Sequence, residues 1–378
     1  MGCGCVRCPR FGLVMNFSSK SNPRPLLIQV VAGMAPGRDG VGDHALALAH
    51  ELQRAFGIET VFAVVNSDER CDLPYRTVYC PPPRLVENCL EFTQGHRGFL
   101  LAHVSGYGYS RDGAPTQLAG ALEGAKASGR YRLAVYFHEL FATGMPWRSA
   151  FWHTRRQQEA LRKLIEQCEL IVTNIEHHAK WLAGETHRLG GAAIERMAVF
   201  STIGEAEERA CFEQRDAAMV VFGLPGSREC SYRQMEATGK LVHALGVEEI
   251  LDVGPEGSRP AHLHGIPVKR MGMLPVEEVR AVLARARFGA VSHPWYNLAK
   301  SSIFAAYCAH GVVPVLAKPF SKETDGLAEG APVVTPRVPG CAERSVWELR
   351  SQAAWDWYRM HRVGVHAERY ATWMREQG

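Results

Sequence analysis

Residues 26–56 read LLIQVVAGMAPGRDGVGDHALALAHELQRAF, and this stretch decides the fold. Its first part, Leu26–Ala32, is an almost unbroken apolar run, which is typical of a strand buried on both faces of a parallel sheet. A loop through Gly40 follows, and the next residues predict an amphipathic helix. The apolar positions that keep helical spacing are Val41, Ala45, Leu48, Ala49, Leu52 and Phe56. A buried strand that runs through a glycine-rich turn into a helix predicts the first half of a βαβ unit.

The same alternation continues along the chain and predicts an α/β protein with helices on both faces of parallel sheets. Further strands are expected at Val61–Val65, Phe99–Val104, Leu133–His138, Leu170–Thr173 and Ala198–Ile203. After a charged stretch at 204–214 the pattern restarts, with strands expected at Ala218–Gly223, Ile250–Val253, Lys269–Met273, Phe288–Ser292 and Val312–Ala317. We therefore expect a disordered tail at 1–22, two Rossmann-like doubly wound domains at 23–205 and 206–350, and a terminal helix at 351–378.

The composition predicts a reduced, cytoplasmic globular protein. The 43 Lys and Arg residues against 39 Asp and Glu give a net charge of +4, which argues against a nucleic-acid binder. No apolar run approaches the roughly 20 residues of a membrane helix, and the 11 cysteines are mostly scattered singly, which favours free thiols. The basic stretch Arg148–Lys163 contains Phe151 and Trp152, so peripheral contact with the inner membrane face is an alternative to an ordinary packed helix there.

Ligands of open parallel sheets bind beyond the carboxyl ends of the strands, so these positions hold the candidate residues of the first half. In GRDGVGD, Gly40 and Gly42 let the backbone approach a ligand without a Cβ in the way, and Asp43 adds a carboxylate to the same turn. The alternative is a plain turn in which glycine serves only the geometry. His138 and Glu139 follow the fourth strand, where they can orient a sugar or move a proton.

A structural histidine bonded to a carbonyl is the competing interpretation of His138. After the third strand, HVSGYGY adds small residues and, with Tyr107, an aromatic edge that suits a saccharide. The second half places Arg228 just after a buried strand, where it could clamp a diphosphate or lie exposed on the surface.

Lys300, Ser301 and Ser302 open an apolar helix, and a cation with two hydroxyls at a helix N-terminus is typical of a phosphate site. Ser301 could instead serve only as the helix cap, although capping does not explain the lysine beside it. The sequence has no D-x-D pair of the kind that clamps a metal on a diphosphate, so no metal and no cofactor are expected. The short histidine pairs His177–His178 and His262–His264 lack carboxylate or cysteine companions and are expected on the surface.

From about Leu26 onward the chain resembles GT-B glycosyltransferases, most closely the retaining proteins called family four. The resemblance is carried by GRDGVGD, by YFHEL at 136–140, by VTNIEHHAKWL at 172–182, by VFSTIGE at 199–205, by FGLPGSR at 222–228 and by KSSIFAAYCAHGVVPVL at 300–316. It implies that Gly40 and Gly42 face the donor phosphates, that His138 meets the transferred sugar, and that Arg228 meets the diphosphate. It also implies that the first half binds the acceptor, with Asp43 and Tyr107 on the acceptor side, and that the last helix crosses back to the first domain. The two glutamates of the family's second-domain motif are missing, because Leu298 and Ala306 stand there, and Lys240 matches the family's diphosphate lysine only loosely.

The resemblance implies transfer of a hexosyl unit from a nucleoside-diphosphate sugar to a saccharide, a lipid-linked acceptor or another hydroxyl, without a metal and with retention. Two alternatives stay open at this point. One is a catalytically silent GT-B domain that binds a sugar or a partner enzyme, which the missing glutamates suggest. The other is a GT-B-like nucleotide-sugar epimerase, which needs no acceptor.

Overall fold

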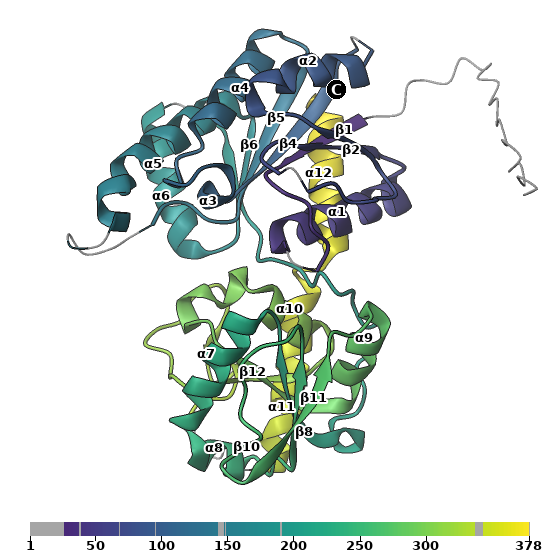
Figure 1. Ribbon diagram of the computed structural model, residues 1–378, viewed down its shortest axis with the longest axis vertical. Coiled ribbons are helices and arrows are strands. Elements are labelled where there is room, and N and C mark those ends of the chain that lie inside the picture. The colour runs from purple at the N-terminus through teal and green to yellow at the C-terminus, as the bar shows by residue number, and fades with distance from the viewer. Residues whose placement is uncertain are drawn as a thin grey trace, which may run out of the picture.

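The computed structural model describes residues 26–377 except 38, 68, 95, 143–146, 148, 190 and 337–342. The chain forms two α/β domains, one above the other in Figure 1, and a pair of C-terminal helices that runs beside both. The expected tail at 1–22 lies outside the described residues.

The first domain is built on a seven-stranded parallel sheet with the order β3-β2-β1-β4-β5-β6-β7. Its strands are β1 Leu26–Val31, β2 Glu59–Val64, β3 Arg76–Tyr79, β4 Gly98–Val104, β5 Tyr131–Phe137, β6 Leu170–Thr173 and β7 Ala193–Arg196. The strand order reverses between β1 and β4, and a reversal of this kind leaves a crevice at the carboxyl ends of the two strands. The loops after β1, β4 and β5 therefore converge.

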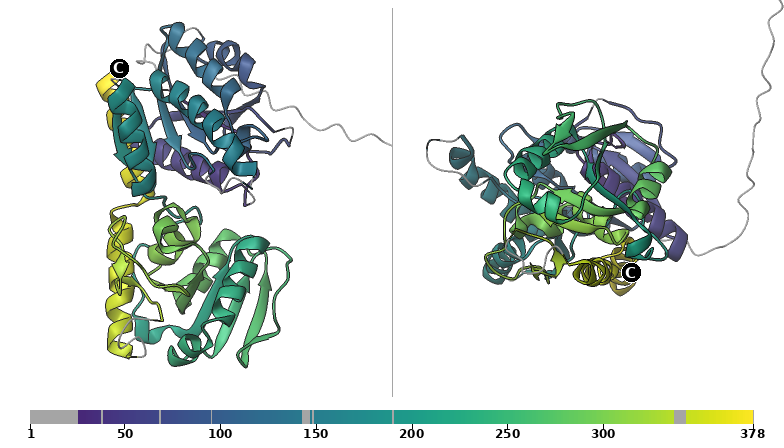
Figure 2. Two further views of the ribbon diagram at one scale, coloured as in Figure 1. Left: turned by 90° about the vertical axis from the view of Figure 1, so that its left-hand side faces the viewer. Right: turned by 90° about the horizontal axis from the view of Figure 1, so that it is seen from below.

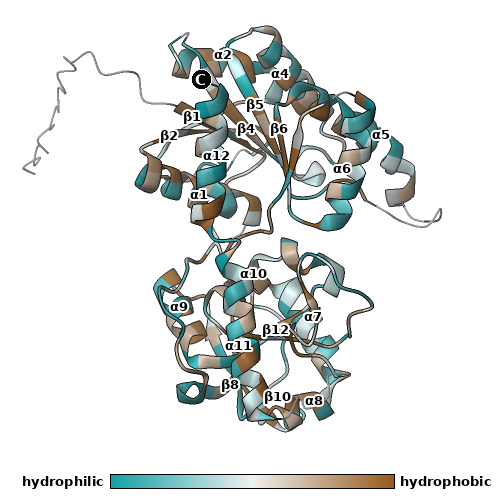
Figure 3. Ribbon diagram, turned by 180° about the vertical axis from the view of Figure 1, so that it is seen from behind, coloured by the Kyte–Doolittle hydropathy of each residue, from teal (hydrophilic) through white to brown (hydrophobic). Residues whose placement is uncertain are grey.

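Helices cover both faces of this sheet, whose central strands are hydrophobic along most of their length (Figure 3). On one face α1 (Gly40–Phe56) packs through Leu48 and Leu52. On the other face α4 (Thr116–Ala127) and α5 (Ser149–Gln167) pack through residues such as Leu122 and Leu164. The remaining helices are α2 Leu85–Phe92, α3 Gly106–Tyr109 and α6 Glu176–Leu189.

The second domain has a six-stranded sheet with the order β10-β11-β9-β8-β12-β13, parallel except for β10. Its strands are β8 Asp216–Phe222, β9 Glu249–Val253, β10 His262–Leu263, β11 Ile266–Gly272, β12 Ala286–Val291 and β13 Val313–Leu316. Its helices are α7 Pro225–Glu236, α8 Gly239–Ala244, α9 Val276–Arg285 and α10 Ser302–Ala309, and a small ladder pairs β14 Ala328–Glu329 with β15 Pro332–Val333.

The C-terminal stretch is two helices rather than one. The helix α11 (Arg344–Arg359) packs on α10 and β15 of the second domain, whereas α12 (Val363–Gln377) packs on α1 of the first. They follow one another along one side of the molecule (Figure 2). The chain thus crosses between the domains twice, at 197–205 and at 360–362, and Tyr358 ties the crossings together because its hydroxyl accepts from Ser201 N (2.9 Å) and donates to Glu205 (2.7 Å).

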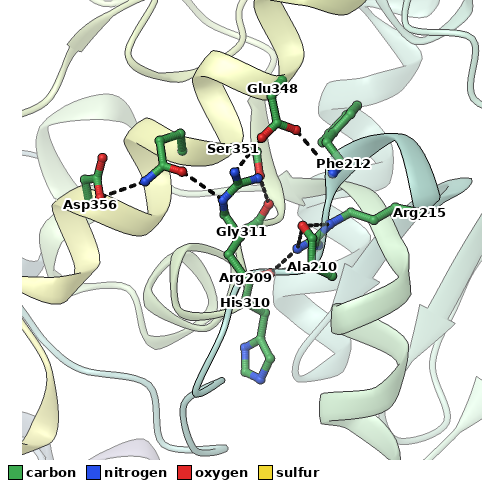
Figure 4. A network of polar contacts seen from close by, with 10 residues as sticks. Arg209, Ala210, Phe212, Arg215, His310, Gly311, Glu348, Ser351 and Asp356 are labelled. Carbon is green, nitrogen blue, oxygen red and sulfur yellow. Dashed lines mark hydrogen bonds and ion pairs between the residues drawn. The ribbon is translucent and has the colours of Figure 1, made fainter.

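Two arginines form a polar network at the start of the second domain, and one of them, Arg209, joins it to α11 (Figure 4). Arg209 donates to Ser351 Oγ at 3.1 Å and to Glu348, while Ser351 donates to the carbonyl of Gly311 at 2.6 Å. Arg215 is 3% exposed and donates to carbonyls that include that of His310 at 2.7 Å. Burial lowers the pKa of Arg215 to about 10, so the group stays charged and its hydrogen bonds stabilise the junction.

The α/β class with two doubly wound sheets and a helix that crosses back is confirmed. The strand expected at Ala198–Ile203 is wrong, because the last strand of the first sheet lies earlier, at Ala193–Arg196. The apolar run that suggested a strand is buried at the junction of the two domains instead. Val199 N donates to the carbonyl of Ala299 in the second domain at 2.8 Å, and the Phe200 ring stacks on His44 of α1 with the ring centroids 4.0 Å apart.

Candidate functional site

Two adjoining cavities lie between the domains and share Gly40, Thr202, Lys300 and Ser302 in their walls. The larger, of about 320 Å³, is lined mainly by loops of the second domain after β8, β9 and β11. The smaller, of about 230 Å³, is lined by first-domain residues that follow β1, β4, β5 and β6. Both cavities therefore lie where the topology of parallel sheets places ligand sites.

The N-terminus of α10 forms one wall of both cavities. Ser301 is 2% exposed and caps the helix, because its hydroxyl accepts from Phe304 N at 3.2 Å. The first backbone N–H groups of a helix have no intrahelical partners, and the first two residues of α10, Ser302 and Ile303, line the larger cavity. Positive helix-end charge beside the Lys300 ammonium makes this wall suitable for an anion.

Lys300 already has an anionic partner from the opposite domain. Its ammonium lies 2.6 Å from Glu139 Oε1, and its side chain is 15% exposed whereas that of Glu139 is 52% exposed. The sequence assigned both residues to the site, and the structure places them in contact across the cleft. An anionic ligand on the α10 wall would compete with Glu139 for Lys300 and would free the carboxylate.

The loop at 37–43 supplies carboxylates as well as glycines. Asp39 caps α1 by accepting from Val41 N at 3.0 Å and Gly42 N at 3.2 Å, while Asp43 accepts from Gly37 N at 3.0 Å. Burial raises the pKa of Asp43, partly offset by the Gly37 bond. Gly40 lines both cavities and has open space around it. Gly42 instead faces Met34, whose Sδ would lie 3.1 Å from an added Cβ, so it serves the packing of the turn.

Arg228 lies behind the wall of the larger cavity, not in it. The side chain is 2% exposed and forms an ion pair with Asp252, which also accepts from the Tyr232 hydroxyl at 2.7 Å. Its guanidinium donates to the carbonyls of Gly223 (2.9 Å) and Pro255, so it braces two loops that line the cavity. The predicted direct contact between Arg228 and a diphosphate is not supported by this arrangement, because the guanidinium is buried and already paired.

Histidines and a glutamine form a chain of hydrogen bonds below the smaller cavity. Gln29 donates to the carbonyl of Ala45 at 3.2 Å, so its Oε1 accepts from His103 Nε2 at 2.7 Å. His103 Nδ1 then accepts from His138 Nε2 at 3.1 Å. This order of donors leaves Nδ1 of His138 as an acceptor, which suits a sugar hydroxyl.

The four imidazoles in and beside this row of hydrogen bonds are neutral. Burial lowers the pKa of His103 to about 3 and that of His366 to about 3. Burial, followed by the neighbouring histidines, holds the pKa of His44 and of His138 well below the ordinary value. The base of the smaller cavity is therefore uncharged, and its charges come from Lys300, Glu139 and Asp39 at its rim.

The structure brings together Gly40, Asp43, His138, Glu139, Lys300, Ser301 and Ser302 in the walls of the two cavities. Tyr107 lies apart on α3, 56% exposed, and is not among the described residues that line either cavity. Lys240 lies on α8, at the end of the second domain remote from the cleft (Figure 1).

Two further polar residues in these walls were missed from the sequence. Asn174 follows β6, donates to the carbonyl of His138 at 3.0 Å and keeps a buried Oδ1 without a hydrogen-bond partner. His293 follows β12 and has an unpartnered Nδ1 in the larger cavity. Both directly follow apolar strands, so the rule that ligands bind at carboxyl ends of strands would have found them.

The sequence matches no protein-family model, and no curated protein is similar to it in sequence. Solved structures are similar in fold. Sucrose-phosphate synthase from Thermosynechococcus elongatus has a TM-score of 0.60 and 10% identity over 94% of this chain and 99% of that one. HepE from Anabaena, in complex with UDP, has a TM-score of 0.57 and 10% identity over 93% and 100%. A trehalose-6-phosphate protein from E. coli, bound with UDP-2-fluoro glucose, has a TM-score of 0.56 and 11% identity over 92% and 98%.

The chain has the GT-B fold. At identities this low, the comparisons bear on the fold and not on the chemistry. The cavity residues described above therefore decide what this GT-B protein can bind.

Proposed function

We propose that this chain is a glycosyltransferase that binds a nucleoside-diphosphate sugar in the cleft and transfers its hexosyl unit to a hydroxyl acceptor. The observation that carries the proposal is the α10 wall, where Lys300 and the helix N-terminus face a cavity of about 320 Å³ that continues into a smaller polar one. UDP or a UDP sugar is bound in two of the structurally similar proteins, which agrees with a donor of this class.

In this proposal the diphosphate binds at Lys300 and Ser302 without a metal. As the bond from the sugar to the diphosphate breaks, negative charge develops on the leaving oxygen. Fixed N–H groups and an ammonium stabilise such charge because they need no reorientation during the reaction. The nucleoside lies in the larger cavity, whose walls include the apolar residues Phe222, Val253 and Ile303.

The transferred sugar occupies the smaller cavity, which offers acceptors for its hydroxyl groups. These are Nδ1 of His138 and Oδ1 of Asn174. When the donor phosphates take Lys300, the carboxylate of Glu139 becomes free to accept a hydrogen bond from the incoming acceptor hydroxyl. Transfer with retention needs no protein base on the far face of the sugar, so we propose retention.

The acceptor is a saccharide or a lipid-linked hydroxyl, and the exposed aromatic residues near α5 favour contact with a membrane surface. Trp147 is 76% and Trp152 is 72% exposed, and Arg155 of the same helix has a 90% exposed side chain. Aromatic and basic side chains together suit an anionic bilayer interface.

Across residues 26–377, outside the gaps already given, no helix combines the length and hydropathy needed to cross a bilayer. Sedimentation with anionic vesicles tests the proposed surface contact, and equal sedimentation of Trp152→Ala and the parent would contradict that contact.

Titration with UDP tests the donor site. We expect Lys300→Ala to weaken UDP binding about 10- to 150-fold, the value of a charge-assisted hydrogen bond of about 1.5–3 kcal/mol. Lys240→Ala is the matched control, since it removes an exposed lysine of the same domain away from the cleft. Equal UDP affinity of Lys300→Ala and the parent would contradict the proposal that Lys300 binds the donor phosphates.

A catalytically silent GT-B binder is the second candidate, because the positions of the family's glutamates are Leu298 and Ala306, which are 0% and 1% exposed. Incubation with a panel of nucleotide sugars and hydroxyl acceptors separates the candidates. A transferase forms a glycosylated acceptor and loses this activity in Lys300→Ala. A silent binder forms none, and an epimerase alters the donor without an acceptor.

A further inference from the structure

Three histidines from different elements converge at the base of the smaller cavity. They are His44 on α1, His103 on β4 and His138 directly after β5, with exposures of 2%, 0% and 9%. One ring nitrogen from each lies within 4.8 Å of the others. His44 and His138 also line the cavity, so the cluster has one side open to it.

The spacing matches the geometry of a tetrahedral metal site. With Zn–N bonds of about 2.0–2.1 Å, two ligand nitrogens lie about 3.4 Å apart. His103 Nδ1 and His138 Nε2 are 3.1 Å apart, so a metal that replaces the proton between them would need almost no movement of this pair, and His138 would then carry its proton on Nδ1. The ring centroids of the three pairs are 4.9, 5.4 and 5.8 Å apart, which brackets the roughly 5 Å that the same bond lengths and angles require.

A buried glutamine supplies the outer support that a metal-bound histidine usually has. Gln29 Oε1 accepts from Nε2 of His103 at 2.7 Å, which fixes the tautomer and leaves the Nδ1 lone pair toward the other two rings. Gln29 is itself fixed by the carbonyl of Ala45 and is 0% exposed. A hydrogen bond of this kind orients metal-binding imidazoles and raises their basicity.

Hydrogen bonding within the cluster does not account for all of its nitrogens. Nε2 of His44 is buried without a hydrogen-bond partner. An unpartnered buried polar atom costs about 1–3 kcal/mol. The His44 ring stacks on Phe200 with the ring centroids 4.0 Å apart, but this contact leaves the nitrogen unpaired.

We propose that His44, His103 and His138 bind one divalent ion of the Zn²⁺ class, with a coordination position open to the smaller cavity. Imidazole ligands suit Zn²⁺, Co²⁺ and Ni²⁺. Three histidines with an open fourth position are typical of zinc sites that bind water or a substrate oxygen. The ion would therefore add a site for a hydroxyl or carboxylate oxygen at the sugar end of the cleft, separate from the phosphate wall at Lys300.

Cobalt titration of the full chain, prepared without a histidine tag and treated with a chelator, tests this proposal. We expect one Co²⁺ per chain with the visible absorption bands of a four-coordinate ion, and displacement of these bands by Zn²⁺. His103→Ala should abolish the bands, and Gln29→Leu should weaken binding about 10- to 100-fold through loss of the outer hydrogen bond.

Two control variants separate this site from other histidines. His177→Ala removes an exposed histidine, and His366→Ala removes a buried one that contacts His44 without belonging to the triad. Both should keep the Co²⁺ bands. Absence of bands in the parent, or bands that persist in folded His103→Ala, would overturn the proposal. UDP affinity measured in the same metal-free samples reports on the donor site independently, so the failure of one proposal is distinguishable from that of the other.

Discussion

Replacement of Arg228 by methionine separates a structural role from a ligand-binding one. The guanidinium and the Asp252 carboxylate are both 2% exposed, so the substitution leaves a buried carboxylate with only the Tyr232 hydroxyl at 2.7 Å and the more distant Arg259 at 3.8 Å. Removal of one partner from a buried ion pair destabilises a protein by about 3–5 kcal/mol. Because Tyr232 and Arg259 remain, we expect the lower end of this range, about 3 kcal/mol.

Urea unfolding followed by tryptophan fluorescence and circular dichroism measures this loss. A double variant, Arg228→Met with Asp252→Asn, removes the orphaned charge but keeps an acceptor for Tyr232. We expect the double variant to recover about 1–2 kcal/mol relative to Arg228→Met, a coupling typical of residues in direct contact.

The same variants distinguish the brace from the phosphate clamp that the sequence suggested. If Arg228 only supports the loops at Gly223 and Pro255, folded Arg228→Met binds UDP more weakly than the parent. Its loss of UDP affinity should be smaller than the loss caused by Lys300→Ala. Our reasoning would be refuted by a variant whose stability equals that of the parent while its UDP binding is lost. That result would mean that the guanidinium leaves Asp252 and contacts the diphosphate.

Three further substitutions test the packing and the charges around the cleft. Tyr358→Phe removes the hydroxyl that joins the two crossings and should cost about 1–3 kcal/mol in urea unfolding, whereas an unchanged midpoint would show that water replaces it. Gly289→Ala places a Cβ 2.7 Å from the Tyr307 ring and should cost about 1–3 kcal/mol, while Gly120→Ala, which meets no atom within 4 Å, should cost nothing. Burial raises the pKa of Glu348, but the hydrogen bond and charge of Arg209 outweigh burial and hold it below the ordinary value. The stability advantage of the parent over Glu348→Gln should therefore be full above the unfolded pKa of about 4.3 and decline as the pH falls through the lower folded pKa; equal urea midpoints of the two proteins at neutral pH would contradict this.

The strand and helix order was predictable because strands buried on both faces leave uninterrupted apolar runs. The run at Ala198–Ile203 misled for the same reason, since burial between domains leaves the same composition as burial in a sheet. The helix break at 360–362 was missed because apolar and aromatic residues continue through it, although the two halves cover different domains.

The site was partly predictable, because strand ends can be recognised and parallel topology brings them together. Lys300 and Glu139 are 161 positions apart, and their contact follows from the closed arrangement of two domains, which local patterns do not encode. The burial of Arg228 depends on Asp252, 24 positions later, whose side chain points at it from a neighbouring strand. Gln29 is the residue from which the histidine cluster could have been predicted. It is a polar residue within an apolar strand, and a buried polar side chain is costly unless it has a hydrogen-bond partner.

The crossing helix α12 has a consequence for the order in which the chain is made. The face of α12 that includes Tyr370, Ala371 and Trp373 is buried, and the helix packs on α1, which lies more than 300 residues earlier in the chain. During synthesis the first domain is translated without this cover, because α12 follows the whole second domain in the chain. The domain that is translated first therefore cannot complete its packing until α12 emerges, and until then the apolar face of α1 is open to non-native contacts.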